Sequence, residues 1–184
     1  TAERTMATAY SIAWDVPLHD WNTFHLDARA HCLATVHDAA VLPALLAETA
    51  LQGLPIMVLG AGSNVLFATE QFKGCLVHLQ CQQARISGND GDHAIVHVDA
   101  GFEWDALVDW TLDRGLQGLE NLALIPGQAG AAPIQNIGAY GVELKDTFHE
   151  LEAIDLCSGE MVKFSAGDCA FGYRDSVFKH KFQG

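Results

Sequence analysis

Residues 119–142 read LENLALIPGQAGAAPIQNIGAYGV, and this stretch decides the fold. It holds four glycines and two prolines, with no charged residue after Glu120. Glycine and proline interrupt helices and strands, so the segment must turn sharply instead of forming a long regular element. A segment so poor in functional side chains works through its backbone, and backbone N–H groups are natural partners of phosphate oxygens. The sequence therefore predicts a loop that closely approaches a phosphate-containing ligand.

A second glycine-rich segment, Gly60-Ala-Gly-Ser-Asn64, directly follows an apolar strand predicted over residues 56–59. A dinucleotide fingerprint at such a place needs a third glycine and a following helix. Val65 stands where that third glycine belongs, and no long helical pattern follows it, so the ordinary Rossmann fold is disfavoured. Two interpretations remain: a structural turn, or a ligand loop in which Ser63 and Asn64 supply hydrogen bonds.

A third segment, Phe171-Gly-Tyr-Arg-Asp-Ser-Val-Phe-Lys179, places an arginine between an aromatic and an acidic residue. The chain has ten lysines and arginines against 23 acidic residues. In so acidic a chain, Arg174 is a natural clamp for a carboxylate or an oxyanion. The alternative is a surface arginine paired with Asp175.

The composition is that of a globular protein, with 49% hydrophobic and 18% charged residues among 184. The net charge of −13 argues against nucleic acid binding, which needs many cations. No stretch approaches the roughly 20 apolar residues of a membrane span, and the first residues do not follow a signal-peptide pattern. We expect one sizeable or two small domains that bind anions locally, with no nucleic acid, membrane insertion or obligate protein partner.

The cysteines and histidines show no metal-binding pattern. The five cysteines are odd in number and lack Cys-x-x-Cys spacing, which favours reduced thiols in the core of a cytoplasmic protein. His93 and His97 have helical spacing but lie in an alternating, strand-like pattern. We therefore expect no metal site.

The periodicity predicts strands and helices without internal repeats. Asp38 has the character of a helix N-cap, and the helix that it begins should end near Gly53. A second helix is predicted from Trp104 to Gly115. Apolar runs or strands are predicted over residues 30–35, 56–59 and 75–79, hairpins over 86–100 and 151–164, and a strand beginning at Val177. Residues 1–20 are expected to be an extended lead-in, with a boundary near 68–74.

The segments that carry chemistry occur in one order along the chain: Trp21-Asn-Thr-Phe24, 59–67 (LGAGSNVLF), 118–127 (GLENLALIPG), 133–141 (PIQNIGAYG) and Gly172-Tyr-Arg-Asp-Ser176. Together they resemble the bacterial UDP-N-acetylenolpyruvoylglucosamine reductases, flavoproteins of cell-wall precursor synthesis. The resemblance implies an α+β fold of the vanillyl-alcohol-oxidase (PCMH) type. In it, residues 21–70 and 71–184 are two small α/β FAD-binding subdomains.

The resemblance also implies that FAD binds noncovalently between the two glycine-rich segments. The residues implied to line it are Gly60, Ala61, Gly62, Ser63, Asn64 and Val65 on one side, and Pro126, Gly127, Gly130, Ala131, Ala132, Asn136, Gly138, Ala139 and Tyr140 on the other. Arg174 matches the family's arginine that contacts the substrate carboxylate and stabilises enolate-like charge, with Tyr173 as substrate-side support. NADPH would reduce the flavin, and hydride would pass from flavin N5 to the enolpyruvyl group of the UDP sugar, giving UDP-N-acetylmuramate. The implied setting is peptidoglycan synthesis in the cytoplasm, and through it cell shape, cell cycle and cell division.

Three features depart from the family pattern. Gln128 stands where a small residue is usual, so its amide is expected to crowd or replace a phosphate contact, and Ala131-Ala132 offers no hydroxyl. The chain also stops before the family's substrate-binding domain, which carries a proton-donating serine and a late glutamate. We therefore expect the second subdomain to be incomplete and this chain alone to be inactive. Two alternatives stay open: a non-catalytic flavin- or nucleotide-binding module, and another oxidoreductase of the same flavin fold.

Overall fold

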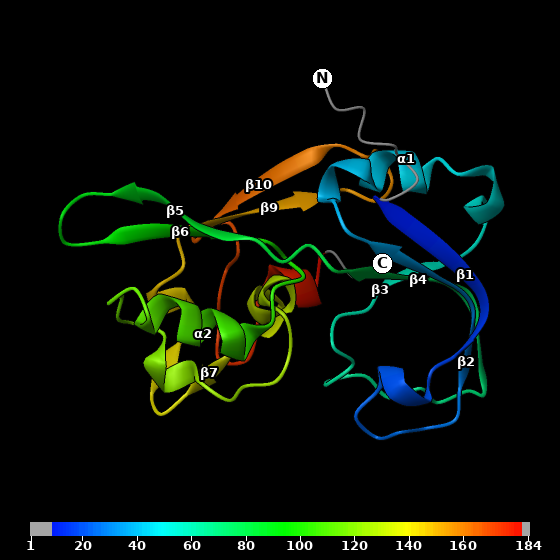
Figure 1. The fold of residues 1–184 in the computed structure, drawn as a ribbon, viewed down its shortest axis with the longest axis horizontal. Helices are drawn as coiled ribbons and strands as arrows, with labels where there is room; N and C mark the ends of the chain where they lie inside the picture. Colours follow the sequence, from blue (N-terminus) through cyan, green and yellow to red (C-terminus); the bar gives the residue numbers. More distant parts are fainter. Residues whose placement is uncertain (1–8, 182–184) are drawn as a thin grey trace. The chain divides into compact units, whose positions relative to one another are not determined.

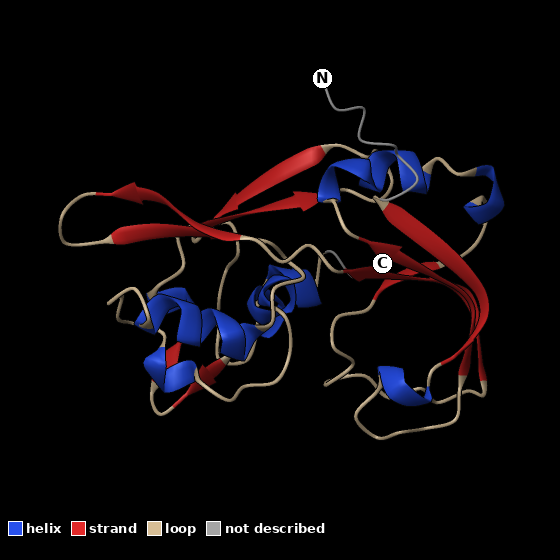
Figure 2. Ribbon diagram, viewed as in Figure 1, coloured by secondary structure: helices blue, strands red, loops and turns tan. Residues whose placement is uncertain are grey.

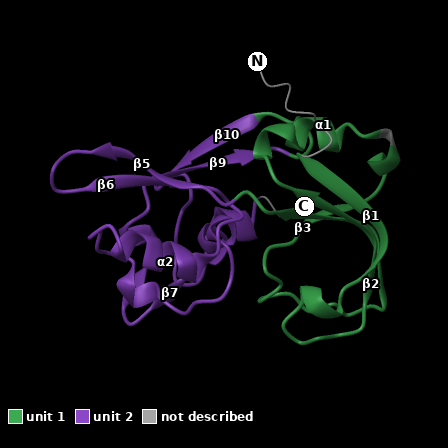
Figure 3. Cartoon of the chain, in the orientation of Figure 1, with its two compact units in different colours: residues 1–81, 156–160 green, residues 82–155, 161–184 purple. Residues whose placement is uncertain are grey.

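The computed structural model describes residues 9–181, which divide into two compact units (Figure 3). Unit 1 runs to Cys81 and includes residues 156–160, and unit 2 comprises residues 82–155 and those from Met161 onward. The division falls after Cys81, later than the 68–74 expected from the sequence, because the strand over 71–79 pairs within the sheet of unit 1. No helix among residues 9–181 is long and apolar enough to cross a membrane.

Unit 1 is built on a four-stranded sheet (Figure 1). Its strands, in the spatial order β1-β2-β4-β3, are β1 (Tyr10–Pro17), β2 (Arg29–Val36), β3 (Ile56–Val58) and β4 (Gln71–Leu79). β1 pairs antiparallel with β2, whereas β2 and β3 both run parallel to β4. The helices of this unit are η2 (His19–Trp21), η3 (Ala39–Val41), α1 (Leu42–Leu46) and η4 (Thr49–Leu51), of which all but α1 are 3-10 helices.

The central strands β2 and β4 correspond to the apolar runs of the sequence. Both are buried over most of their length, as expected for parallel strands covered on two faces. The core beside them comprises Leu18, Ala28, Ala30, Leu33, Leu59 and Leu76. Each fully buried leucine there stabilises the fold by roughly 1.5–3 kcal/mol.

Two parts of unit 1 differ from the sequence-based expectation. The predicted lead-in contains β1, whose alternation is interrupted at Asp15 by a φ of 52°. The predicted helix from Asp38 is divided. The Asp38 carboxylate does accept a hydrogen bond from the Ala40 N–H, but it caps η3, and α1 begins anew around Pro43. Proline is tolerated in the first turn of a helix and not in its interior, so the chain starts a second short helix there.

Unit 2 combines hairpins, the helix α2 and short 3-10 helices (Figure 2). The hairpins are β5 (Ala84–Asn89) with β6 (Ala94–Val98), β7 (Gly138–Ala139) with β8 (Val142–Glu143), and β9 (Glu150–Ile154) with β10 (Met161–Ser165). The helices are α2 (Trp104–Leu112), η5 (Glu120–Leu122), η6 (Ala129–Gln135), η7 (Leu144–Asp146) and η8 (Val177–Lys179). The core residues of this unit are Trp104, Leu107, Val108, Leu122, Ala129, Ala132, Ile137 and Leu144.

The helix and both hairpins predicted for this region are confirmed. The strand predicted from Val177 is wrong, because residues 177–179 form the 3-10 helix η8. The Ser176 hydroxyl accepts a hydrogen bond from the Phe178 N–H at 3.3 Å and so caps that helix. Ser176 is thus a helix start at a place where the alternation of apolar residues predicts a strand.

Candidate functional site

The glycine loop of unit 1, residues 60–65, lies at the carboxyl end of β3. The N–H groups of Gly60, Ala61 and Gly62 donate to no acceptor among the described residues, whereas Ser63 and Asn64 both take part in interactions. The loop contains no charged side chain. Unpaired backbone N–H groups gathered in one turn form a concave site for anions. The loop therefore offers backbone donors, and no carboxylate, to an anion.

Gly62 holds this loop against the Trp21 segment. Its φ is 68°, and a Cβ built on it would lie 2.1 Å from the Trp21 carbonyl oxygen. The Gly62 carbonyl in turn accepts a hydrogen bond from Thr23 N–H at 3.4 Å. Any side chain at this position is excluded by both conformation and space. This glycine is required by packing within unit 1, apart from any ligand.

Two buried polar side chains, His78 and Asn22, hold the backbone of the segments next to the loop, and sequence reasoning missed both. The His78 ring nitrogen Nδ1 lies 2.9 Å from the Leu59 carbonyl, and its ring meets Trp21 edge-on at 4.9 Å. Asn22 is 3% exposed and bonds the Leu18 and Leu26 carbonyls and the Leu26 N–H. A histidine within an apolar strand and an asparagine after a tryptophan gave no signal for these contacts, which depend on tertiary neighbours.

Several amides of the glycine-rich segment of unit 2, among them those of Ala129, Gly130 and Ala131, are hydrogen-bonded within that unit. Residues 127–130 run along residues 100–104, with Trp104 N–H donating to Gly127, Ala129 N–H to Phe102 and Gly130 N–H to Ala100, all at 2.8–3.0 Å. A Cβ on Gly130 would lie 2.5 Å from the Ala100 Cβ, so this glycine permits close packing of the two backbones. The Ala131 N–H donates to the Gln128 carbonyl. These amides are hydrogen-bonded within the protein.

The Gln128 side chain has a hydrogen-bond partner within its own unit. Its side-chain Nε2 donates to the Gly101 carbonyl at 3.2 Å, so the amide is used within unit 2.

The segment just before Gln128 is held by a carboxylate: Asp105 Oδ1 accepts the Leu124 N–H at 2.7 Å. Leu124 has φ of 61° and a largely exposed side chain. Backbone strain of this kind costs of order 1–3 kcal/mol and often marks functional segments.

The hairpin formed by β7 and β8 turns through two residues with positive φ. Tyr140 has φ of 53° and Gly141 has φ of 82°, as a two-residue hairpin turn of the primed type requires. The Tyr140 side chain is 89% exposed. The turn therefore presents an aromatic ring outward at the end of the glycine-rich segment.

Arg174 lies in a tight turn that contacts this hairpin. Gly172 and Asp175 form an isolated antiparallel bridge, which leaves Tyr173 and Arg174 at the tip. Both side chains are exposed, and the Arg174 Nη2 donates to the Gly138 carbonyl at 2.6 Å. The structure thus brings the predicted substrate arginine to one of the predicted flavin-binding residues.

The alternative of an Arg174–Asp175 ion pair is not realised among the described residues. The Asp175 carboxylate instead lies 2.9–3.0 Å from His180 Nε2. This hydrogen bond lowers the pKa of Asp175 below its ordinary value. The Arg174 guanidinium keeps donors available for an anion, since it carries five N–H groups.

The predicted cofactor-binding residues fall into two groups by unit. Those in unit 1 are Gly60, Ala61, Gly62, Ser63, Asn64 and Val65, and those in unit 2 are Pro126, Gly127, Gly130, Ala131, Ala132, Asn136, Gly138, Ala139 and Tyr140. The first group forms one loop, in which the N–H groups of Gly60, Ala61 and Gly62 have no acceptor among the described residues, and the second runs from the segment before η6 through η6 into the β7–β8 hairpin. The Asn136 side chain is fully buried and is bonded within unit 2.

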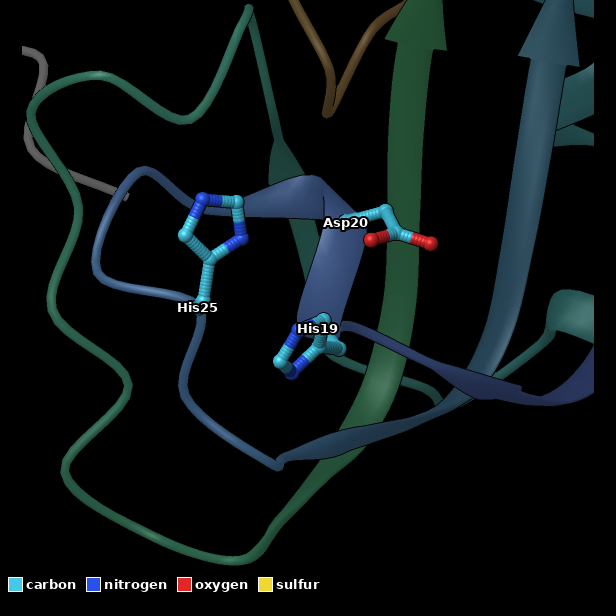
Figure 4. Close-up of side chains that lie close together, drawn as sticks. All are labelled: His19, Asp20 and His25. Atoms are coloured by element: carbon cyan, nitrogen blue, oxygen red, sulfur yellow. The ribbon is translucent and has the colours of Figure 1, made fainter.

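A further cluster of possible metal ligands lies on η2 and the following loop. His19, Asp20 and His25 place one ligand atom each within 4.8 Å of one another (Figure 4). His19 Nδ1 also lies 3.1 Å from an Asp27 carboxylate oxygen. All three side chains are exposed, and groups of this kind are common on surfaces without a metal. We therefore assign them no metal-binding role.

Curated relatives align with nearly the whole chain. The UDP-N-acetylenolpyruvoylglucosamine reductase of Xanthomonas euvesicatoria pv. vesicatoria is 49% identical over 95% of this chain and 49% of that protein. The enzyme of the same name from Pseudomonas putida is 44% identical over 92% of the chain and 50% of its own length. The resemblance noted from the sequence is thus confirmed. The chain spans about half the length of the curated relatives that it matches.

Solved structures agree with this on the fold. The crystal structure of UDP-N-acetylenolpyruvylglucosamine reductase from Thermus caldophilus matches with a TM-score of 0.72 at 28% identity, over 91% of this chain and 56% of that one. A cholesterol oxidase matches at 0.62 with 16% identity, over 90% of this chain and 35% of its own, which shows the fold alone. The fold expected from the sequence, α+β of the PCMH type, is confirmed. The model of the FAD binding domain family matches residues 30–165, and this chain belongs to that family.

Proposed function

We propose that this chain is the FAD-binding part of an NADPH-dependent reductase that converts UDP-N-acetylenolpyruvoylglucosamine to UDP-N-acetylmuramate. The observation that carries the proposal is the contact of Arg174 with Gly138, which joins an anion-binding side chain to a glycine-rich segment in a chain of the FAD binding domain family. The similarity to reductases of that name supports it. The reaction would belong to peptidoglycan precursor synthesis in the cytoplasm, and so to cell shape and division.

In this proposal the loop of unit 1 binds the cofactor diphosphate. Gly60, Ala61 and Gly62 offer N–H groups that have no other acceptor among the described residues. Each hydrogen bond to a charged oxygen is worth on the order of 1.5–3 kcal/mol. Such donors bind an anion without lysine, which suits a chain of net charge −13. FAD, when bound, supplies the hydride-transfer chemistry, and the protein orients and polarises the substrate.

Arg174 is proposed to hold the substrate carboxylate and to stabilise negative charge that develops beside it. A guanidinium binds a carboxylate through two parallel N–H groups, which fixes orientation as well as charge. Its contact to Gly138 keeps it beside the hairpin that ends in Tyr140. Tyr173, exposed at the same turn, is proposed to support the substrate on this side.

The test uses the complete protein, with NADPH oxidation measured in the presence of the enolpyruvyl sugar nucleotide. Arg174→Ala should lower turnover about 10²–10³-fold, the usual loss when a group stabilising developing charge is removed. The Kd for FAD should stay unchanged. Arg114→Ala, which removes an exposed arginine stacked on Trp110 in α2, is the matched control and should leave turnover intact. If Arg174→Ala lowered FAD affinity and turnover equally, Arg174 would not be the residue that holds the substrate carboxylate.

A second measurement concerns the 184-residue chain itself. An intact mass together with a visible absorption spectrum reports the flavin content of the purified chain. We expect a flavin spectrum after incubation with FAD and no NADPH oxidation with the sugar nucleotide. A chain that binds no FAD at all contradicts the proposal.

A further inference from the structure

Asn136 is the most deeply buried polar residue of the glycine-rich segment. It ends η6 in the left-handed conformation, with φ of 44°, and its side chain is 0% exposed. Its Nδ2 donates to the Gly172 carbonyl at 2.9 Å, and its Oδ1 accepts the Lys145 N–H at 3.0 Å. Both polar atoms of the side chain are therefore bonded inside unit 2. The side-chain amide is thus engaged in the interior of unit 2.

Ser176 makes a second connection between the same two segments. It is 1% exposed, and its hydroxyl donates to the Ile134 carbonyl of η6 at 2.6 Å. The same oxygen accepts the Phe178 N–H, so the hydroxyl is used as donor and acceptor. A buried hydroxyl bonded in both directions fixes its backbone strongly, because breaking either bond leaves an unsatisfied group inside the protein.

These two side chains flank the turn that carries Arg174. Asn136 bonds the residue that begins the turn, Gly172, and Ser176 directly follows the residue that ends it, Asp175. The turn is strained, since Arg174 has φ of 53°. Lys179 Nζ, which donates to the Arg174 carbonyl at 2.9 Å, adds a third restraint. A non-glycine residue remains in such a conformation where its surroundings determine it.

We propose that Asn136 and Ser176 are positioning residues that fix the Arg174 turn to η6, so that the substrate arginine and the glycine-rich segment move as one body. The proposal deepens the function proposed above and rests on it for the role of Arg174. It assigns Asn136 a role different from that of the flavin ligand implied by the sequence resemblance. Neither side chain touches a reacting atom, and both act through the backbone of the turn.

The test combines hydrogen exchange of the 184-residue chain with kinetics of the complete protein. In Ser176→Ala, the amides of Gly172 and Asp175, which bond each other's carbonyls, should exchange about tenfold faster than in the wild type, the change expected when one hydrogen bond is lost. Ser87→Ala is the matched control, because its hydroxyl also donates to a backbone carbonyl but lies in the exposed β5–β6 hairpin. The control should leave the turn amides unchanged.

Asn136→Asp gives an independent variant of similar size. It keeps the acceptor for the Lys145 N–H and loses the donor to Gly172, so the same two amides should again exchange faster. Asn89→Asp is its control, since the Asn89 side chain accepts the Gly91 N–H in an exposed turn. Should Asn136→Asp fail to fold, Ser176→Ala alone decides the outcome.

In the complete protein, Ser176→Ala should raise KM for the sugar nucleotide and lower kcat, with the Kd for FAD unchanged. If Ser176 were purely structural, Ser176→Ala would lower the melting temperature, and KM, kcat and the Kd for FAD would all keep their wild-type values. Turn amides that exchange at the wild-type rate, or wild-type kinetics despite faster exchange, overturn the proposal. If the wild-type protein reduces no such substrate, the proposed function fails, and the exchange data still decide whether these side chains hold the turn.

Discussion

The two glycine-rich segments of this chain look alike in sequence and are used differently. In unit 1, the N–H groups of Gly60, Ala61 and Gly62 point to no acceptor among the described residues. In unit 2, the N–H groups of Gly130 and Ala131 donate to carbonyls of the same unit. Glycine content alone therefore does not identify a phosphate-binding backbone. What matters is whether another backbone already accepts the amides.

The cause of the difference lies in the neighbours of each segment. Residues 127–130 run along residues 100–104: the Ala129 and Gly130 amides donate to the carbonyls of Phe102 and Ala100, and the Gly127 carbonyl accepts the Trp104 N–H. Residues 60–65 leave the end of β3, and Gly62 among them packs on the Trp21 backbone. We call residues 127–130 the scaffold, because their amides and carbonyls are bonded within unit 2, and we propose that residues 60–65 are an anion site. Both conclusions can be tested by substitution.

The largest effect is expected at Gly62. In Gly62→Ala, the new Cβ would meet the Trp21 carbonyl at 2.1 Å, in a conformation with φ of 68°. Overpacking and left-handed strain together should lower the free energy of unfolding by about 3 kcal/mol. Denaturant unfolding followed by tryptophan fluorescence measures it.

Gly53→Ala is the matched control for that substitution. Gly53 has φ of 78° but nothing within 4 Å of a built Cβ, so the change should cost the conformational strain alone, about 1 kcal/mol. Equal losses for the two variants would mean that the Trp21 contact does not shape the loop.

Gly130→Ala should have the next largest effect and acts on the scaffold. Its Cβ would lie 2.5 Å from the Ala100 Cβ and 3.0 Å from the Ala100 carbonyl oxygen, so the two backbones must separate. We expect a loss of about 2 kcal/mol in unfolding free energy. Gly167→Ala, where the nearest atom lies at 3.8 Å, should change it by less than about 1 kcal/mol in either direction. If Gly130→Ala left the free energy of unfolding unchanged, this segment would be held as loosely as the loop of unit 1.

A titration with FAD compares the two segments amide by amide. In ¹H–¹⁵N spectra of the labelled chain, the resonances of Gly60, Ala61 and Gly62 should shift most, because their N–H groups are open to a diphosphate. Those of Gly130 and Ala131 should shift several-fold less. Riboflavin, which lacks the diphosphate, is the control and should leave residues 60–62 unshifted. Equal shifts in both segments would remove the distinction between scaffold and anion site.

The sequence predicted the elements that depend on local pattern. The helix from Trp104, the hairpins around 88–91 and 158–159, and the cap at Asp38 follow from periodicity, turn residues and a capping side chain. The family resemblance placed the glycine-rich segments and Arg174. These signals are local or lie in short motifs, so they survive without knowledge of tertiary contacts.

The remainder depends on which segments meet in space. No local pattern shows that β1 pairs with β2, that His78 supports the Leu59 carbonyl, or that the Asn136 amide is bonded to Gly172. The same limit applied to the glycine-rich segment of unit 2, whose amides were expected to serve a ligand. Hydrogen-bond occupancy is a tertiary property, and sequence composition does not report it.

The smallest expected effect is a pH dependence at the start of the glycine-rich segment of unit 2. The Glu120 carboxylate accepts the Gly118 N–H at 2.5 Å, and this hydrogen bond lowers its pKa below the ordinary 4.5. A carboxyl whose pKa is lower in the folded state stabilises that state above its unfolded pKa, and this stabilisation is lost as pH falls through the folded value. The loop at residues 60–65 contains no carboxylate. Acidification from pH 7 to below about 4 should therefore weaken the contact of Glu120 with Gly118 and leave the loop at residues 60–65 without a corresponding change.

The measurement compares urea midpoints of the wild type and Glu120→Gln between pH 7 and pH 3. The wild type should be slightly more stable at neutral pH, and the difference should vanish in acid, because the protonated glutamate and the glutamine are both neutral acceptors. Glu103→Gln, which removes a carboxylate with no hydrogen-bond partner among residues 9–181, controls for the change in net charge. A separation between wild type and Glu120→Gln that stays constant across this range would show that the carboxylate does not hold the start of the segment. The two glycine-rich segments would then differ in their backbone partners alone.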